Sequence, residues 1–335
     1  MDDRSCNNAT TSGAHWSNAT DNSSLDYACL HYSYWGDPLA AIEIAAMVLV
    51  IVCNTAGLAS LYRTTAISGS FKPYIANLLL ANLAMAILEN PLDILFELSC
   101  DRWTLSWAAC DFFLYCNYVF AGWEMHAHLL ITVNRLWAMI FPYNYRHRHT
   151  MTTSFVLTTG AFIYVHAWIL PGLVRDSLFF RIMGRECEVN GDAQRPWQLM
   201  VQTFLFLAPI AFVAGSYVCL VVRQRMRLKT RPDAPEIELQ SRPTDNGTSG
   251  EAPAALKKTR RQNSRAFFIL TLLTCSLVVT WTPYQVCQLL QIGGVTVNDD
   301  VVGALDVLWI IQSILDPLLS TSIVSDVRTV FVQRH

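Results

Sequence analysis

Charged residues are scarce in this chain, and this scarcity limits what the protein can be. Asp, Glu, Lys and Arg make up 15% of its 335 residues, against roughly 25% in soluble domains. The hydrophobic share is 53%, and the charges crowd the two ends and one internal segment. Soluble amphipathic helices show a polar face, which the long apolar runs between these charges mostly lack. The composition therefore excludes an ordinary soluble protein and predicts a membrane protein.

Seven apolar stretches are long enough to cross a bilayer, which takes about 20 mostly apolar residues. The fourth, fifth and sixth hold no Asp, Glu or Lys in their cores, whereas acids interrupt the second and the third. We predict an all-α fold in which seven transmembrane helices form one bundle. The predicted spans lie near residues 39–62, 74–98, 108–138, 152–174, 198–224, 264–291 and 299–323.

The distribution of Lys and Arg predicts an extracellular N-terminus, because basic residues favour the cytoplasmic side. In that orientation 18 of the 24 Lys and Arg residues are cytoplasmic. The chain then divides into an extracellular tail (1–37), a seven-helix domain (38–325) and a short cytoplasmic tail (326–335). The cytoplasmic loop 225–263 is rich in Pro and charge, and we expect it to be largely disordered.

The N-terminal tail lacks the apolar core of a cleavable signal peptide, so we expect the first span to serve as the insertion signal. Glycosylation sequons begin at Asn8, Asn18 and Asn22, which agrees with an extracellular tail. The chain also lacks an internal repeat, which weighs against transporters built from duplicated halves.

Half of the ten cysteines lie on the predicted outer side, where disulfides can persist. These are Cys6, Cys29, Cys100, Cys110 and Cys187. Since five is an odd number, at least one of them is unpaired or bonded to another molecule. The other five cysteines lie within predicted spans, and we expect them to be reduced.

Prolines lie within several spans, and a basic residue ends the third. Pro91, Pro209, Pro283 and Pro317 each remove a helix hydrogen bond, which makes either a static kink or a pivot. Arg135, at the cytoplasmic end of the third span, is either a snorkelling anchor or a contact for an intracellular partner.

Several motifs stand in a characteristic order along the chain. They are Asn54, Leu80-Ala81-Asn82-Leu83-Ala84, Trp103, Cys110, Asn134-Arg135-Leu136, Phe141-Pro142, Cys187, Pro209, Tyr217, Trp281-Thr282-Pro283, Asp316-Pro317-Leu318-Leu319-Ser320 and Asp326-Val327-Arg328. In this set the chain resembles the rhodopsin-like (class A) G-protein-coupled receptors, from about residue 39 to 331. It departs from their pattern with Asn134 in the DRY motif, and with Asp316 and Ser320 in the NPxxY motif.

The resemblance implies a multi-pass plasma-membrane receptor, not an enzyme, with a short amphipathic eighth helix near Asp326. It implies a disulfide between Cys110 and Cys187, and coupling to a heterotrimeric G protein through Arg135. The partners would be an extracellular small-molecule or peptide ligand, the G protein and the lipid bilayer, and no nucleic acid. Ile310 stands where light receptors carry the retinal-binding Lys, so we expect no retinal.

Acids in the outer halves of three spans are particular to this chain. Glu89, Asp93 and Glu97 are spaced by four and share a helix face, and Glu43 and Asp306 lie on spans that adjoin it in the family's layout. The acids either face water near the span ends or form an anionic pocket for a cationic ligand. The amine-anchoring Asp of the family is replaced by Asn117. We expect the ligand to contact Asp306, Asn117, Tyr118, Glu89, Asp93, Trp281, Tyr284, Gln285, Gln288 and Trp309.

A second polar set lies deeper, where the family commonly binds sodium. Asn82 replaces the usual Asp, while Glu124 and Asp316 add carboxylates nearby. With Gln312 and Ser313 they offer oxygen ligands to a small cation such as sodium, or the two carboxylates share a proton. We expect a cation- or proton-linked switch here, and we expect His126 and His128 to be packing residues.

The altered motifs bear on signalling. Asn134 cannot form the ion pair that an Asp gives Arg135, which predicts elevated ligand-independent activity. Tyr217 loses its usual partner because Ser320 replaces the tyrosine of the seventh span. Two alternatives remain: a transporter or ion channel, since intramembrane acids also mark ion paths, and a binding receptor with weak or no G-protein coupling.

Overall fold

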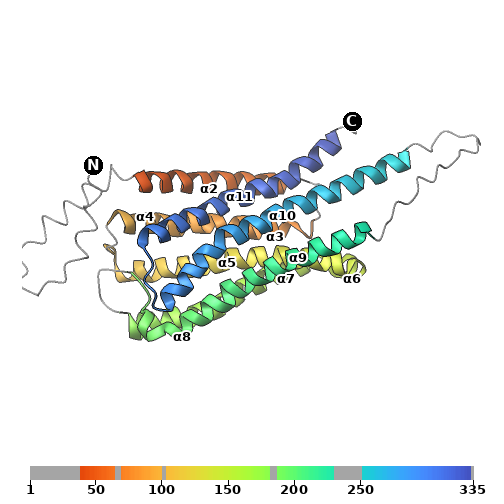
Figure 1. Cartoon of the computed structure of the whole chain (residues 1–335). Helices are drawn as coiled ribbons and strands as arrows, with labels where there is room; N and C mark the ends of the chain where they lie inside the picture. The colour runs from red at the N-terminus through yellow and green to blue at the C-terminus, as the bar shows by residue number, and fades with distance from the viewer. Residues whose placement is uncertain (1–37, 65–68, 100–102, 182–186, 230–250, 333–335) are drawn as a thin grey trace, which may run out of the picture.

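The computed structural model describes residues 38–64, 69–99, 103–181, 187–229 and 251–332. The described residues form seven long helical rods and one short connecting helix, and contain no strand (Figure 1). The rods are α2 (Pro38–Arg63); α3 (Lys72–Ala84), η1 (Met85–Glu89) and α4 (Asn90–Leu98); α5 (Trp107–Ile140); α7 (Met151–Arg175) and η2 (Asp176–Phe180); α8 (Gly191–Val201), η3 (Gln202–Leu207) and α9 (Ala208–Lys229); α10 (Glu251–Ile292); and α11 (Asp299–Val332). The short helix is α6 (Pro142–Arg148).

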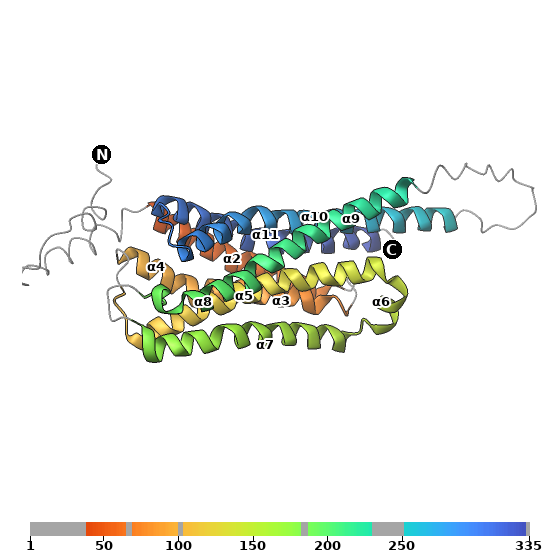
Figure 2. The ribbon, with the colours of Figure 1, turned by 60° about the horizontal axis from the view of Figure 1, so that its bottom comes forward.

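The rods lie side by side as one elongated bundle (Figure 2). We call the end where α2 begins the outer end and the end that carries α6 the inner end, after the predicted orientation. Three other predicted features lie outside the described residues. They are the sequons at Asn8, Asn18 and Asn22, the central part of the predicted cytoplasmic loop (230–250) and the last three residues.

Five of the rods are long and apolar enough to cross a membrane by length and composition. The apolar stretches are Ala41–Arg63, Lys72–Phe96, Met151–Phe180, Gly191–Val222 and Val301–Ser320. Among the fully described rods α5 falls short of that composition, and the side chains of α10 are described only from residue 271 on. The 34-residue helix α5 is long enough, but it carries Glu124, His126 and His128 in its middle, and all three are buried inside the bundle.

The core forms around α5. Its Val119 and Met125 are completely buried and belong to one hydrophobic cluster with Val165 and Ile169 of α7 and Leu205 of η3. The polar residues of α5 therefore face the interior of the bundle, which explains how a helix of modest hydropathy is accommodated at its centre.

Three wide π-helical turns adjoin prolines. The turn η1 ends two residues before Pro91, η3 ends two residues before Pro209, and η2 begins within the turns that follow Pro171. Proline cannot donate the usual hydrogen bond, and wide turns of this kind accommodate the lost bond. Pro283 and Pro317 instead lie inside the continuous helices α10 and α11.

The seventh rod continues without interruption to Val332. A separate eighth helix beginning near Asp326 is therefore not seen in the described residues, and the expectation of one is not confirmed. The segment after Pro317 contains neither Gly nor Pro up to Val332, so the local sequence offers no helix breaker.

At the outer end a disulfide and a network of ion pairs join the start of α5 to residues that follow η2. The predicted bond between Cys110 and Cys187 is present, with a Cα–Cα distance of 5.7 Å. Next to it the buried Arg181 side chain pairs with Asp111 and, through Nε, with Asp176 Oδ2 at 2.7 Å. The five cysteines predicted within spans are free.

Close packing of α7 against α8 gives a test of this fold. A Cβ atom added at Gly172 would lie 1.9 Å from Cε2 of Trp197, whose indole donates a 3.0 Å hydrogen bond to the Trp168 carbonyl. We expect Gly172→Ala to lower the free energy of unfolding by about 1–3 kcal/mol, because the buried ring must move. The measurement is thermal unfolding of the purified protein in detergent.

Gly160 of the same helix is the matched control, since nothing lies within 4 Å of an added Cβ there. Gly160→Ala should leave the melting temperature unchanged or raise it, because Ala favours a helix interior by about 1 kcal/mol over Gly. Equal melting temperatures for the two variants would contradict the packing described.

Candidate functional site

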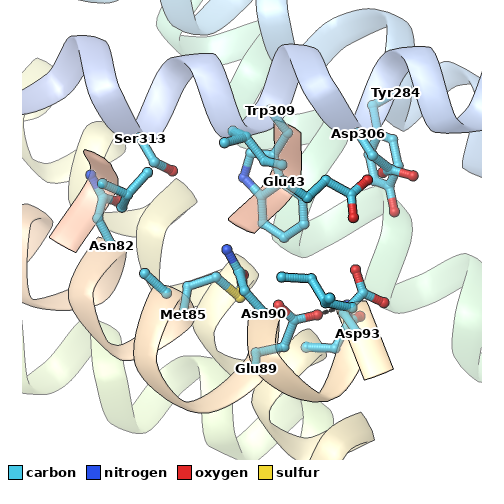
Figure 3. A pocket seen from close by; sticks show the side chains of 15 residues that line it. Glu43, Asn82, Met85, Glu89, Asn90, Asp93, Tyr284, Asp306, Trp309 and Ser313 are labelled. Atoms are coloured by element: carbon cyan, nitrogen blue, oxygen red, sulfur yellow. Dashed lines mark hydrogen bonds between the residues drawn. The ribbon is translucent and has the colours of Figure 1, made fainter. Parts of the chain in front are cut away.

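A pocket enters the bundle between α2, α3, η1, α4, α5, α10 and α11 (Figure 3). It encloses about 780 Å³, counting the part that opens to solvent. Four carboxylates line it, and none of its lining residues is Lys, Arg or His. Its lining consists of Glu43, Val50, Asn82, Met85, Ala86, Glu89, Asn90, Asp93, Ile94, Asn117, Tyr284, Asp306, Trp309, Ile310 and Ser313.

The four acids come from four different elements. Glu43 belongs to α2, Glu89 to η1, Asp93 to α4 and Asp306 to α11. Figure 3 shows Asp93 and Asp306 toward one end of the pocket, together with Tyr284, and Asn82 and Ser313 at the opposite end. Because like charges repel, the acid-lined end favours a cation or bound protons. The side chain of Glu97 lies outside the described residues.

Glu89 is the most buried of these acids, at 2% exposure. Its Oε1 accepts a 2.9 Å hydrogen bond from Asn117 Nδ2. Asn117 therefore contributes a donor to the acidic pocket from the position where related amine receptors place an acid. It holds a carboxylate supplied by the neighbouring rod.

The residues expected to contact a ligand separate into two groups. Asp306, Asn117, Glu89, Asp93, Tyr284 and Trp309 line the pocket. Tyr118, Trp281, Gln285 and Gln288 do not.

Each residue of the second group has another place in the bundle. Tyr118 packs against the ring of Trp197, with centroids 5.8 Å apart. Gln285 accepts hydrogen bonds from Gln202 Nε2 through its backbone and side-chain oxygens, at 2.9 and 2.6 Å. Trp281 lies behind the pocket wall, with its ring 5.6 Å from that of Trp309. Gln288 follows Tyr284 by one turn of α10.

Met85 and Asn90 line the pocket although no sequence motif singled them out, and Ile310, noted only for the absence of a retinal-binding Lys, lines it too. Asn90 immediately follows Glu89, and on a regular helix the two would face different directions. The wide turn η1 ends between them, and a turn of this kind cannot be inferred from residue spacing alone.

Deeper in the bundle, Asp316 is the centre of a buried hydrogen-bond network. Its Oδ1 accepts from Gln312 Nε2 at 2.6 Å. Its Oδ2 accepts from Asn82 Nδ2 at 3.1 Å and lies 3.1 Å from His128 Nε2. Asn82 also donates to Asn54 Oδ1 at 3.3 Å. The network thus joins four rods through one carboxylate.

Glu124 is the second carboxylate at this depth and is completely buried. Its Oε2 accepts a 3.2 Å hydrogen bond from Trp309 Nε1, while Oε1 has no hydrogen-bond partner. Ligand atoms of Glu124, His128 and Asp316 all lie within 4.8 Å of one another. Trp309 also lines the outer pocket, so one side chain joins the two sites.

His128 was expected to be a packing residue, and the structure places it in this network. A helical spacing of four from Glu124 was the signal that could have found it, since residues four apart share a face. His126, two residues earlier, fits the expectation better. Its Nδ1 bonds to the carbonyl of Gly122 at 2.8 Å, and its ring packs on Tyr164.

At the inner end, Asn134 forms a neutral network where the family's motif would place an acid. Its Nδ2 lies 2.7 Å from His149 Nε2, and its Oδ1 accepts from the Tyr145 hydroxyl at 3.1 Å. The guanidinium of Arg135 lies over the ring of Phe71, 4.0 Å from its centroid. Within the described part of the chain Arg135 has no ion pair.

The other switch residues named from the sequence differ in their burial. Ser320 is buried and Tyr217 is half-buried. Pro317 is buried in α11, whereas Pro283 is exposed on α10. The side chains of residues 223–270, which include the basic ends of the predicted cytoplasmic loop, lie outside the described residues.

Comparison with known proteins agrees with this geometry. The family described as 7 transmembrane receptor (rhodopsin family) matches residues 46–319. A probable G-protein coupled receptor 19 from Homo sapiens is 22% identical over 231 residues, 68% of this chain and 50% of that protein. Tyramine receptor 1 of Locusta migratoria is 23% identical over 61% of this chain and 42% of its own length. The 5-hydroxytryptamine receptor 1B of Mus musculus is 22% identical over 77% of this chain and 66% of its own length. The chain thus spans about half of the length of the first of these relatives.

The inner network gives a prediction for stability against pH. Burial, and then the charge of Arg135, hold the pKa of His149 below its ordinary value of 6.5. The unfolded chain therefore binds a proton that the folded chain resists, and the free energy of unfolding falls as pH drops below about 6.5. His149 faces Asn134, Tyr145 and Ser154.

We expect His149→Gln to reduce this acid sensitivity, because the amide does not titrate. The measurement compares melting temperatures of the purified protein at about pH 7.5 and about pH 5.5. His147→Gln serves as the control, since His147 is exposed and should behave as wild type. An unchanged pH dependence in His149→Gln would contradict the assignment.

Proposed function

Since the chain belongs to the rhodopsin family of seven-transmembrane receptors, we propose that it binds an extracellular cationic ligand and activates a heterotrimeric G protein. The observation that carries the ligand proposal is the outer pocket, with four carboxylates in its lining and no basic residue. We place the receptor in the plasma membrane as a multi-pass protein with its N-terminus outside. The family is one of receptors, which favours this function over transport or ion conduction.

Electrostatics supports a cationic ligand. Two unit charges 4 Å apart attract by about 4 kcal/mol at the effective dielectric constant of a protein surface. Asp306 and Asp93 are partly exposed and are therefore reachable from the opening. Beside them the rings of Tyr284 and Trp309 stack with centroids 6.0 Å apart, and aromatic faces attract cations.

An amine or guanidinium group is the chemistry we favour, carried by a small molecule or by a peptide. Two of the relatives are named for tyramine and 5-hydroxytryptamine, which are both amines. In this chain Asn117 is bonded to Glu89, so the amine would be held by Asp306 and Asp93 at the other side of the pocket.

A ligand in this pocket would act on the rest of the bundle through two tryptophans. Trp309 lines the pocket and its ring contacts that of Trp281 edge to face. Trp281 lies two residues before Pro283 in α10, where the missing hydrogen bond weakens the helix. We propose that ligand contact with Trp309 shifts α10 and frees the Arg135 end of α5 for the G protein.

The inner end also supports a second candidate, a binding receptor with weak or no G-protein coupling. Asn134 and Ser320 replace motif residues of the family. The Arg135 guanidinium stacks on the Phe71 ring and is therefore already engaged in a contact within the bundle. Guanine-nucleotide exchange on an added G protein discriminates between the two candidates, because only the coupled receptor accelerates it.

Asp306→Asn tests the ligand proposal. We expect potency in a panel of protonated amines, including tyramine and 5-hydroxytryptamine, and of cationic peptides to fall at least tenfold. Truncating one partner of a buried charge pair costs about 2–5 kcal/mol, and every 1.4 kcal/mol is about a factor of ten. The measurement is a concentration–response curve for nucleotide exchange, or for displacement of a labelled hit if exchange is weak.

Asp192→Asn is the matched control for this experiment. Asp192 is an exposed acid near the outer end of α8 and does not line the pocket, so potency should stay at the wild-type value. Equal potency at Asp306→Asn and wild type would remove Asp306 as the anchor.

Asn134→Asp tests the expectation of ligand-independent signalling. The acid would give Arg135 an ion-pair partner and draw it away from Phe71, which favours the inactive arrangement. An equilibrium shifted by one or two kcal/mol changes about five- to thirtyfold. We therefore expect basal nucleotide exchange to fall several-fold in this variant.

Asn134→Ala separates the ion pair from local packing, because it also removes the bonds to His149 and Tyr145 but adds no charge. It should not lower basal exchange. If wild-type membranes show the same basal exchange as membranes without the receptor, the expectation of ligand-independent activity fails.

A further inference from the structure

Three metal-ligating side chains meet in the interior, below the outer pocket. Glu124 and His128 lie one turn apart on α5, and Asp316 faces them from α11. Their exposures are 0%, 2% and 0%. One ligand atom of each lies within 4.8 Å of the others. No Lys or Arg among the described residues pairs with either carboxylate.

The unpartnered oxygen of Glu124 points to a missing positive group. Oε2 is held by Trp309, whereas Oε1 is buried without a hydrogen-bond partner. Leaving a buried acceptor unsatisfied is unfavourable, and more so when it is charged. Asp316 already accepts from Gln312 and Asn82 and faces His128, so the free coordination capacity at this depth is on Glu124.

We propose that this cluster binds a divalent transition-metal ion of the zinc class, coordinated by Glu124 Oε1, His128 Nε2 and Asp316 Oδ2. Imidazole nitrogen suits zinc and its neighbours, while sodium, calcium and magnesium take oxygen ligands. Two carboxylates with one neutral imidazole balance the charge of a divalent ion. The proposal concerns a second site, and it does not depend on which ligand the outer pocket takes.

The geometry is close to that of a three-ligand zinc site. Zinc bonds to oxygen and nitrogen measure about 2.0–2.2 Å, which sets tetrahedral ligand atoms about 3.4 Å apart. His128 Nε2 and Asp316 Oδ2 are already 3.1 Å apart. Glu124 offers a carboxylate oxygen within 4.8 Å of both other ligand atoms, so its side chain would turn to bring Oε1 to the same spacing. On binding, the metal displaces the proton between His128 Nε2 and Asp316 Oδ2. Whether that proton moves to the solvent or to His128 Nδ1, the imidazole that coordinates is neutral, with its proton on Nδ1.

The surrounding residues orient the ligands as outer partners of metal sites do. Gln312 holds Asp316 through the oxygen that is not proposed as a ligand, and Trp309 does the same for Glu124. The outer pocket reaches Asn82 and Ser313, and Asn82 is bonded to Asp316. The pocket therefore ends next to the proposed site.

A bound metal would tie α5 to α11. Since Trp309 also lines the outer pocket, metal and ligand would act on the same side chain, and each would change the affinity of the other by the same factor. The site would make the receptor responsive to divalent metal as well as to its ligand.

The test uses the purified full chain in detergent, stripped with a chelator and kept in sodium chloride at physiological concentration. Zinc is titrated by calorimetry, and cobalt(II) is titrated as a spectroscopic probe whose visible absorption reports its coordination. We expect one metal ion per chain at micromolar concentration or tighter, with an absorption spectrum of low coordination number. We expect His128→Gln and Glu124→Gln each to weaken zinc binding by at least tenfold.

The matched control is His126→Gln, because His126 is buried on the same helix but bonds to the Gly122 carbonyl. It should bind zinc as the wild type does. Both Gln variants keep a polar group at the site, and their melting without metal verifies folding. If one does not fold, the other carries the comparison.

Three results would overturn the proposal. The first is a wild-type chain that binds no zinc at these concentrations, including one whose site takes sodium only. The second is an affinity equal to wild type in the folded His128→Gln or Glu124→Gln variant. The third is an equal loss in His126→Gln, which would show a general effect of removing a buried imidazole.

Discussion

The structure depends on the need to satisfy charged and polar groups that are buried between helices. A charge at the centre of a membrane is expensive, and it persists only with partners inside the protein. Asp316 meets this need with Gln312, Asn82 and His128. These contacts fix the register of α11 against α3 and α5. They thereby position Trp309 between the Asp316 network and the outer pocket. The candidate ligand site is thus held in place by a carboxylate that does not line it.

Much of the fold was predictable from residue order. The apolar runs predicted the rods, the resemblance to a receptor family predicted the bond between Cys110 and Cys187, and helical spacing predicted that Glu89 and Asp93 share a face. The last of these predictions rests on periodicity, which a regular helix preserves. The hydropathy of α5 was a weaker guide, because Glu124, His126 and His128 are accommodated by the interior of the bundle.

Other features could not be predicted, for physical reasons. A wide turn adds a residue and rotates the following face by about 100°. The turn η1 therefore changes which residues face the pocket, and Asn90 is one that spacing alone does not reveal. The contribution of His128 depends on Asp316, which is 188 positions away in sequence. Arg135 lies on Phe71, and this choice of partner depends on how α3 packs against α5.

The outer closure has a consequence for robustness. Two residues that follow the turn η2 are attached to the start of α5 in chemically unrelated ways: Cys187 covalently to Cys110, and Arg181 ionically to Asp111. A reducing agent acts on the first and leaves the second, whereas salt leaves a disulfide intact and screens a partly buried ion pair only weakly. The mouth of the bundle is therefore insulated from changes in either the redox state or the ionic strength of its surroundings, since neither change alone removes both attachments.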